Sequence, residues 1–319
     1  MLRERAGRLQ ASPLRGGSVI IGTRGSALAL AQTHTIVRAI AAKIGEEPDV
    51  VTVSTEGDRS TESLASLGGT GVFASALREA LLAGECDVVV HSLKDLPTAA
   101  HPGLVIGAVP KRVDARDALI ARDGLTLDTL PAGARVGTGS PRRVAQLRSR
   151  RPDLDVVDIR GNVDTRLGFV ASGELDAVVL AAAGLHRLGR LDSVTEYLDL
   201  TGWPTAAGQG ALAIEVRSGS EKLVSALNHP TSRLLVEAER QTLALLEAGC
   251  AAPVGVHALA EDGMLFLDAR VYAADGSSYL TSSHALYLAD ATDAAGELAE
   301  RVSTELFELG AAALMGASA

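Results

Sequence analysis

The chain has 319 residues, of which 47% are hydrophobic, 22% are charged and only 3% are aromatic, and its formal net charge is −9. This length predicts two or three domains with cores built largely from Ala, Val and Leu. The acidic balance argues against general binding to nucleic acid. Two cysteines do not make a disulfide framework, and no segment is apolar over the ~20 residues of a membrane span.

The first 17 residues contain four arginines and no apolar run of the signal-peptide type. We therefore expect residues 1–17 to form a disordered extension. With no export signal and no apolar span, we expect a cytoplasmic protein that binds neither membrane nor nucleic acid.

The next two thirds of the chain alternate short β-branched runs with helical patterns. Before Asp117, strands are predicted at 19–21, 50–54, 86–91 and 104–109, and helices at 27–44 and 74–82. After Asp117, strands are predicted at 135–137, 155–159, 176–180 and 212–216, and helices from 141, at 162–172 and at 181–188. This alternation predicts parallel sheets covered on both faces. In a two-lobed α/β protein a strand this late in the chain often returns to the first sheet, and we expect this of the strand at 212–216.

The pattern changes near residue 230. A long amphipathic helix is predicted at 232–247, three apolar runs follow at 254–260, 264–272 and 282–288, and a helix at 294–309 closes the chain. Asp262-Gly263 and Asp275-Gly276 separate the runs, and Asp-Gly between apolar runs indicates a hairpin. This part therefore predicts an α+β module with two helices against an antiparallel sheet.

These patterns divide the chain into three expected domains. Domain 1 is an α/β unit of residues 18–112 and 208–226, domain 2 is an arginine-rich α/β unit of residues 116–204, and domain 3 is the α+β module of residues 230–319.

Seven arginines lie between residues 142 and 166. Ser140 and Pro141 suit an N-cap and a first helical position, which puts Arg142 and Arg143 in the first turn. Cations there oppose the helix dipole, and a bound anion would resolve that conflict. We expect anion binding from Arg142, Arg143, Arg160 and Arg166. The alternative of a solvated basic face suits Arg148, Arg150 and Arg151 better.

A second candidate site is the segment His91-Ser92-Leu93-Lys94-Asp95-Leu96-Pro97, which follows a buried strand. Ligands of open α/β sheets bind outside the carboxyl ends of the strands. Lys94 and Asp95 are therefore candidates for a site, although a plain surface ion pair would look the same in sequence.

The two cysteines differ in their surroundings. Cys86 lies in a predicted strand and is expected to be a small buried hydrophobe. Cys250 lies among small residues after a long helix and could be accessible, although an ordinary thiol is the alternative. The histidines lack the spacing of metal ligands, so no metal is expected.

Nine segments in this order make the chain resemble the porphobilinogen deaminases over roughly residues 19–310. They are GTRGSALA at 22–29, TEGD at 55–58, GGTGVF at 68–73, HSLKDLP at 91–97, GTGSPRR at 137–143, RGNVDTR at 160–166, AGLHRLG at 183–189, GQGA at 208–211 and EAGC at 247–250. The resemblance implies two lobes like those of periplasmic binding proteins with a cleft between them, a smaller third domain, and a cytoplasmic monomer.

The resemblance also implies the site residues. Cys250 would bind a dipyrromethane cofactor through a thioether, and Asp95 would be the catalytic carboxylate. The positions implied to bind cofactor and substrate are Arg24, Ser26, Gln32, Lys94, Thr138, Ser140, Arg142, Arg143, Arg160, Arg166, Arg187 and Gln209.

The implied activity is that of a hydroxymethylbilane synthase, a transferase of tetrapyrrole and haem biosynthesis. It joins four porphobilinogen molecules head to tail, with loss of ammonia, on the dipyrromethane primer. Each unit carries an acetate and a propionate, and an arginine lining would neutralise so many carboxylates. The competing hypothesis is a two-lobed organic-anion binding protein without catalysis, which would not explain Cys250.

Overall fold

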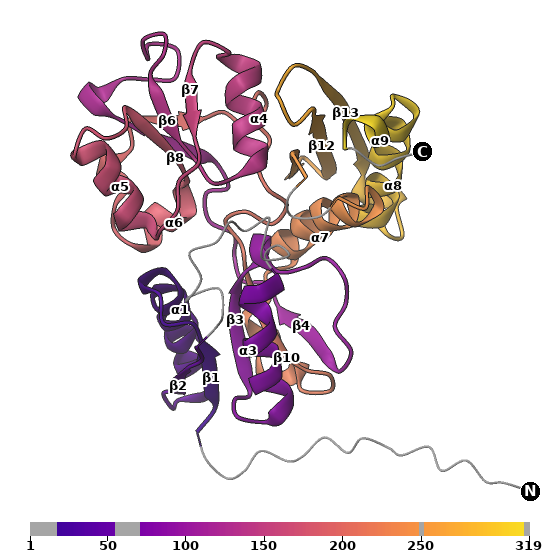
Figure 1. Ribbon diagram of the computed structural model, residues 1–319. Coiled ribbons are helices and arrows are strands. Elements are labelled where there is room, and N and C mark those ends of the chain that lie inside the picture. The colour runs from indigo at the N-terminus through magenta and orange to yellow at the C-terminus, as the bar shows by residue number, and fades with distance from the viewer. Residues whose placement is uncertain (1–17, 55–70, 249–251, 316–319) are drawn as a thin grey trace, which may run out of the picture.

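The computed structural model describes residues 18–54, 71–248 and 252–315 (Figure 1), and three sheets organise this part of the chain. None of the helices within these ranges combines the length and the apolar character that crossing a membrane requires.

The first sheet has five strands in the order β2-β1-β3-β10-β4. They are β1 (Ile20–Thr23), β2 (Asp49–Thr52), β3 (Val88–Ser92), β4 (Leu104–Ala108) and β10 (Leu212–Arg217). Strand β10 pairs antiparallel with both β3 and β4, and Figure 1 shows this late strand inside the first unit. The predicted return of the chain to the first sheet is confirmed. Helices α1 (Ala27–Ile44) and α3 (Gly71–Ala83) pack on this sheet.

The second sheet repeats the plan with the order β7-β6-β8-β5-β9. Its strands are β5 (Asp117–Ala121), β6 (Arg135–Gly137), β7 (Asp155–Val157), β8 (Ala177–Ala181) and β9 (Glu196–Leu198), and its helices are α4 (Pro141–Arg150), α5 (Val163–Ala171) and α6 (Ala182–Arg187). Strand β5 runs antiparallel to β8 and β9. The prediction of parallel sheets is therefore wrong for both units. In each unit, the strand that the chain forms on entering from the other unit, β10 or β5, runs antiparallel to its neighbours.

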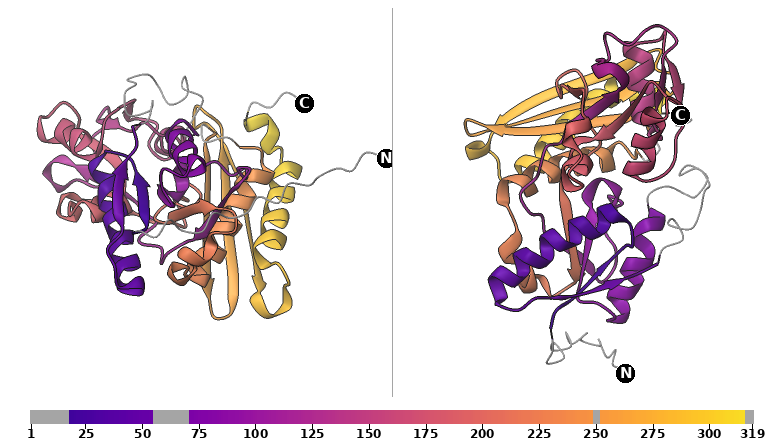
Figure 2. Two further views of the ribbon diagram at one scale, coloured as in Figure 1. Left: turned by 90° about the horizontal axis from the view of Figure 1, so that it is seen from below. Right: turned by 90° about the vertical axis from the view of Figure 1, so that its left-hand side faces the viewer.

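The third sheet is antiparallel in the order β11-β12-β13. It consists of β11 (Val254–Glu261), β12 (Met264–Tyr272) and β13 (Tyr279–Tyr287), with helices α7 (Pro230–Leu245), α8 (Ala294–Glu308) and the short α9 (Ala311–Leu314). The left view of Figure 2 shows α8, in yellow, lying along this sheet. The predicted α+β module is confirmed.

The turn between β11 and β12 shows why the hairpin forms at Asp-Gly. Glu261 pairs with Met264 across a two-residue loop, and φ is 49° at Asp262 and 75° at Gly263. A two-residue turn with two positive φ angles matches the twist of the flanking strands. Asp-Gly adopts these angles at low energetic cost.

The chain passes between the two α/β units twice, through residues 109–116 and 199–211. The two connections touch where the amide of Val113 donates to the carbonyl of Gly210, at 3.4 Å. Gly210 has a φ of +87°, and a Cβ built there would lie 2.7 Å from the carbonyl oxygen of Val113 and 3.0 Å from that of Asp114.

We expect Gly210→Ala to destabilise the protein more than Gly219→Ala. Gly219 has nearly the same φ, +90°, but a Cβ there meets nothing within 4 Å. Its substitution should cost only the left-handed penalty of roughly 1–2 kcal/mol, whereas Gly210→Ala should add ~1–3 kcal/mol because the two connections must move apart. Urea unfolding of both variants measures the difference, and equal midpoints would contradict this packing.

Candidate functional site

Most of the described site residues predicted from the sequence follow the carboxyl ends of parallel strands in the two α/β units. Arg24 and Ser26 follow β1, and Lys94 and Asp95 follow β3. In the second unit Thr138 and Ser140 follow β6, Arg160 follows β7, Arg166 lies on α5 and Arg187 ends α6 after β8. This is the edge at which open α/β sheets bind ligands.

Helix α1 contributes an N-cap and a buried amide to this edge. Ser26 caps the helix, and its Oγ accepts a hydrogen bond from the amide of Ala29 at 3.3 Å. Gln32 is buried, and its Nε2 donates to the Oγ of Ser92 at 2.7 Å. Gln32 therefore fixes α1 to the end of β3, directly before the turn that carries Lys94 and Asp95.

That turn is a short 3-10 helix, η1 (Leu93–Asp95). A side chain from the α+β module holds it in place. Arg240 on α7 donates to the carbonyls of Leu96 at 2.8 Å and Pro97 at 2.7 Å, and more weakly to that of Leu93 at 3.4 Å. Three carbonyls held by one guanidinium define the path of the backbone that carries Asp95.

Lys94 lies at this turn under the influence of two carboxylates and two guanidiniums. Burial, reinforced by the charges of Arg143 and Arg142, lowers the pKa of Lys94 to about 8, although Asp95 and Asp117 act in the opposite direction. A bound carboxylate would favour the charged form of this ammonium.

Arg142 and Arg143 occupy the first turn of α4, as predicted, and both are buried. We expected a bound anion to be their counter-charge, but the structure shows that the protein supplies one itself. Asp117, fully buried at the start of β5, lies 3.0 Å from Nη1 of Arg142 and 2.6 Å from Nη2 of Arg143. Burial alone would raise the pKa of Asp117, but the two guanidiniums outweigh burial and hold that pKa well below its usual range.

Two arginines against one carboxylate leave a surplus positive charge in this cluster. The Nε atoms of Arg142 and Arg143 are buried without a hydrogen-bond partner among the described residues, and Ser140 caps α4 without using its side chain. Buried donors without acceptors are costly. The donor set therefore fits a polycarboxylate ligand such as the dipyrromethane cofactor.

Gln209 joins the two units at this cluster. Its Nε2 donates to the carbonyl of Ala115 and to Oδ1 of Asp117, both at 2.8 Å. Its Oε1 accepts from Nζ of Lys94 at 3.3 Å and from Nη2 of Arg143 at 3.5 Å. One amide thus connects motifs that lie far apart in the sequence.

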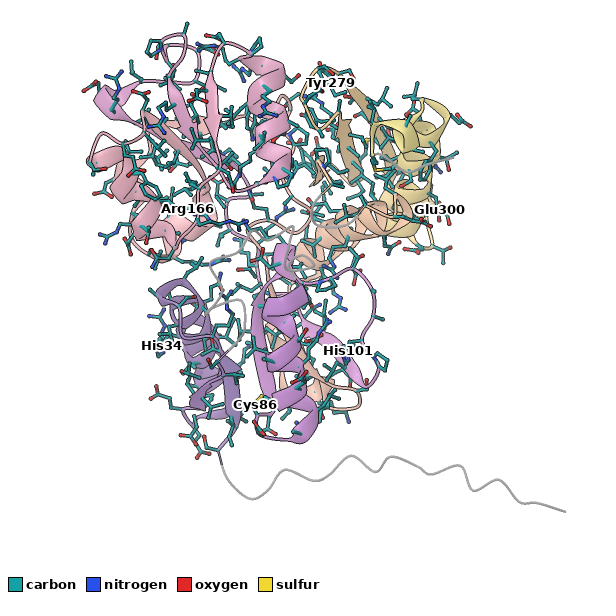
Figure 3. The ribbon with its side chains drawn as sticks, in the orientation of Figure 1. His34, Cys86, His101, Arg166, Tyr279 and Glu300 are labelled. Carbon is teal, nitrogen blue, oxygen red and sulfur yellow. The ribbon has the colours of Figure 1, made fainter. Side chains whose placement is uncertain are left out.

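Arg166 and Arg187 extend the cationic edge of the second unit, and Figure 3 shows Arg166 on the side that faces α1. Burial, followed by the charges of Arg143 and Arg160, lowers the pKa of Arg166 to about 10, and burial lowers that of Arg187 to about 10. Arg187 also donates to the carbonyl of Gly210 at 2.8 Å. Crowded and partly desolvated cations of this kind gain from a bound anion.

Two of the three arginines expected on the solvated face of α4 are exposed. Arg148 and Arg150 are exposed, and Arg150 pairs with Asp128 at 3.1 Å. The expectation for Arg151 is wrong, because its partly buried guanidinium donates to the carbonyls of Leu127 and Leu130. Thr138 is fully buried, and its hydroxyl accepts from the amide of Ser140.

Asp117, Trp203 and Arg240 contact the site but were not predicted from the sequence. Trp203 is the only tryptophan of the chain, and its Nε1 donates to Oδ2 of Asp117 at 2.9 Å. Two signals in the sequence could have pointed to them: Trp203 is a single tryptophan, and Asp117 is a carboxylate at the start of an apolar run. Nothing in the sequence alone marks Arg240 among the other helix-borne arginines.

Of the two cysteines, only Cys86 lies within the part of the chain that the structure describes. Cys250 lies outside them, as do residues 1–17 and the segment 55–70. Cys86 precedes β3 and is 1% exposed, and burial raises its thiol pKa to about 11. Cys86 is therefore an unreactive core residue, as expected. Among residues 18–54, 71–248 and 252–315, no group of three or more His, Cys, Asp or Glu side chains could hold a metal ion.

Comparison with known proteins matches two family models. The model described as porphobilinogen deaminase, dipyrromethane cofactor binding domain, matches residues 19–225, and the porphobilinogen deaminase C-terminal domain matches residues 233–308. Among solved structures, the methionine-binding protein MetQ is similar with a TM-score of 0.43 and 12% identity, over 66% of this chain and 89% of that chain.

Curated relatives named porphobilinogen deaminase match almost the whole chain. The protein of Leifsonia xyli is 59% identical over 94% of this chain and 95% of its own length. That of Thermobifida fusca is 52% identical over 91% and 93%, and that of Mycobacterium tuberculosis is 52% identical over 92% and 97%. The chain belongs to the porphobilinogen deaminase family.

Proposed function

We propose that Asp95 is the catalytic carboxylate of this chain and that Cys250 carries its dipyrromethane cofactor. The activity is that of the family, a hydroxymethylbilane synthase that joins four porphobilinogen molecules head to tail with loss of ammonia. The alternative of a non-catalytic anion-binding protein is not favoured by these relatives.

The observation that carries this assignment is the bridge through Gln209. It accepts from Lys94, the neighbour of Asp95, and from Arg143, on the anion-binding helix of the other unit. This bridge supports our placing the carboxylate and the arginines in one site. The predicted set of Arg24, Ser26, Gln32, Lys94, Thr138, Ser140, Arg142, Arg143, Arg160, Arg166, Arg187 and Gln209 remains our proposal for binding.

The side chains of this site divide the chemistry between them. Loss of ammonia from the aminomethyl group of porphobilinogen leaves a cation delocalised over the pyrrole. Asp95, held by the turn that Arg240 fastens, stabilises this cation more than it stabilises the neutral ring. Asp95 also serves as the proton relay. The guanidiniums and Lys94 hold the acetate and propionate groups, which orients each ring.

The cofactor, when bound, supplies a primer pyrrole whose free α-carbon is the nucleophile. Arg142, Arg143 and Ser140 would hold its carboxylates, since these residues have unused buried donors or a hydroxyl not spent on capping. Their positive charge, only partly neutralised by Asp117, matches such a ligand.

We also propose that the chain works as a cytoplasmic monomer without a nucleic-acid or membrane partner. Its net charge of −9 opposes general attraction to nucleic acid. For the domains we propose 18–112 with 208–226, 116–204, and 230–319. The three sheets, each confined to one of these ranges, support this division.

We expect purified Cys250→Ser to fold without a covalent cofactor and Cys86→Ser to keep it. Cys86 is buried with a raised thiol pKa and is a poor nucleophile. Intact mass of the wild type and both variants measures the difference, which is the mass of one dipyrromethane. Cofactor mass retained by Cys250→Ser would refute the attachment site.

A further inference from the structure

Asp117 is the most densely bonded carboxylate of the arginine cluster. Its Oδ1 accepts from Nη2 of Arg143 at 2.6 Å and from Nε2 of Gln209 at 2.8 Å. Its Oδ2 lies 2.9 Å from Nε1 of Trp203 and 3.0 Å from Nη1 of Arg142. Each oxygen therefore has two donors, and the side chain is fully buried.

The four donors come from two different parts of the chain. Arg142 and Arg143 belong to the first turn of α4, while Trp203 and Gln209 belong to the second connection between the units. Asp117 itself begins β5, where the first connection ends. One carboxylate thus ties the anion-binding turn to both connections.

The charge arrangement has a consequence for ligand binding. Two cations at a helix N-terminus repel each other and oppose the dipole. Without Asp117 they would be held by neutral acceptors: Gln146 and the carbonyl of Pro204 for Arg142, and the carbonyl of Val179 for Arg143. Asp117 cancels one of the two charges and leaves the other, together with both unpaired Nε atoms, for a ligand. Donors fixed before the ligand arrives lose less entropy on binding.

We propose that Asp117 is the positioning residue of the anion-binding arginines. It holds Arg142 and Arg143 in their binding geometry in the absence of ligand, and it does not touch the reacting atoms. This inference rests on the proposed function, because it assigns a role at the same site. Trp203 strengthens the arrangement by fixing the second oxygen of the carboxylate.

The test compares Asp117→Asn with Asp128→Asn. The control carboxylate also pairs with an arginine of α4, but at the exposed Arg150. Asp117→Asn should raise KM for porphobilinogen about tenfold, with a smaller change in kcat, or yield folded protein that lacks the cofactor mass. Asp128→Asn should leave KM, kcat and cofactor mass unchanged.

Trp203→Phe provides a second variant in case Asp117→Asn does not fold. It keeps the buried aromatic volume and removes one donor from Asp117, so KM should rise about threefold at nearly constant kcat. An unchanged KM in Trp203→Phe, or in a folded and cofactor-loaded Asp117→Asn, would overturn the positioning role. The wild type assayed alongside separates the two proposals, since absence of turnover there would contradict the function itself.

Discussion

Asp95→Ala is expected to lose nearly all turnover while the chain still folds. The carboxylate stabilises a cation that exists only along the reaction path, so its removal should appear in kcat. Loss of one preorganised charge-stabilising group costs ~10²–10³-fold in kcat. The fold should survive because Asp95 is only partly buried, and the turn is held through backbone carbonyls by Arg240.

Two further substitutions separate charge from shape at this position. Asp95→Asn keeps the shape without the charge and should resemble Asp95→Ala. Asp95→Glu keeps the charge one methylene away, and it should retain activity well below wild type and well above Asp95→Ala, because placement also matters. Steady-state rates of the purified variants measure the order. If Asp95→Asn were as active as Asp95→Glu, charge stabilisation would be wrong.

Arg143→Leu is expected to abolish elongation and also to weaken the fold. The anion-binding role expected from the sequence accounts for a loss of activity but gives no reason for a loss of stability. The structure changes that expectation, because Asp117 loses its 2.6 Å partner and stays buried. Breaking a buried ion pair from one side costs ~3–5 kcal/mol.

Arg150→Leu is the matched control on the same helix. Its pair with Asp128 is exposed, and such pairs contribute little. Stability should change by no more than ~0.5 kcal/mol and turnover should not change. Urea unfolding and steady-state assays of both variants measure the contrast. Equal effects at positions 143 and 150 would place both arginines on a solvated face.

Much of the fold could be predicted from the sequence because periodicity reports burial directly. The predicted helix at 27–44 and the strand at 135–137 match α1 and β6. Strand β9 was missed because three residues, Glu-Tyr-Leu, carry no period. Strand β5 was missed because a charged Asp117 heads its apolar run. Its antiparallel direction depends on how the chain crosses between units, which local patterns do not report.

Site residues that lie in a recognisable motif could be predicted from the sequence. Site residues whose interaction partners lie far away in the sequence could not. Lys94 and Asp95 were recognisable because they directly follow a buried strand. The need of Arg142 and Arg143 for an anion was also visible, but the identity of that anion was not. Asp117 reaches them only after the second sheet has formed, because β5 and α4 meet through tertiary structure.

The most direct test of the whole account is the stoichiometry of porphobilinogen turnover by the purified chain. Porphobilinogen consumed, ammonia released and linear tetrapyrrole formed are measured in one reaction. A hydroxymethylbilane synthase should consume four porphobilinogen molecules and release four ammonia molecules for each tetrapyrrole. Porphobilinogen that is bound and recovered intact, with no ammonia released, would contradict the account and identify an anion-binding protein.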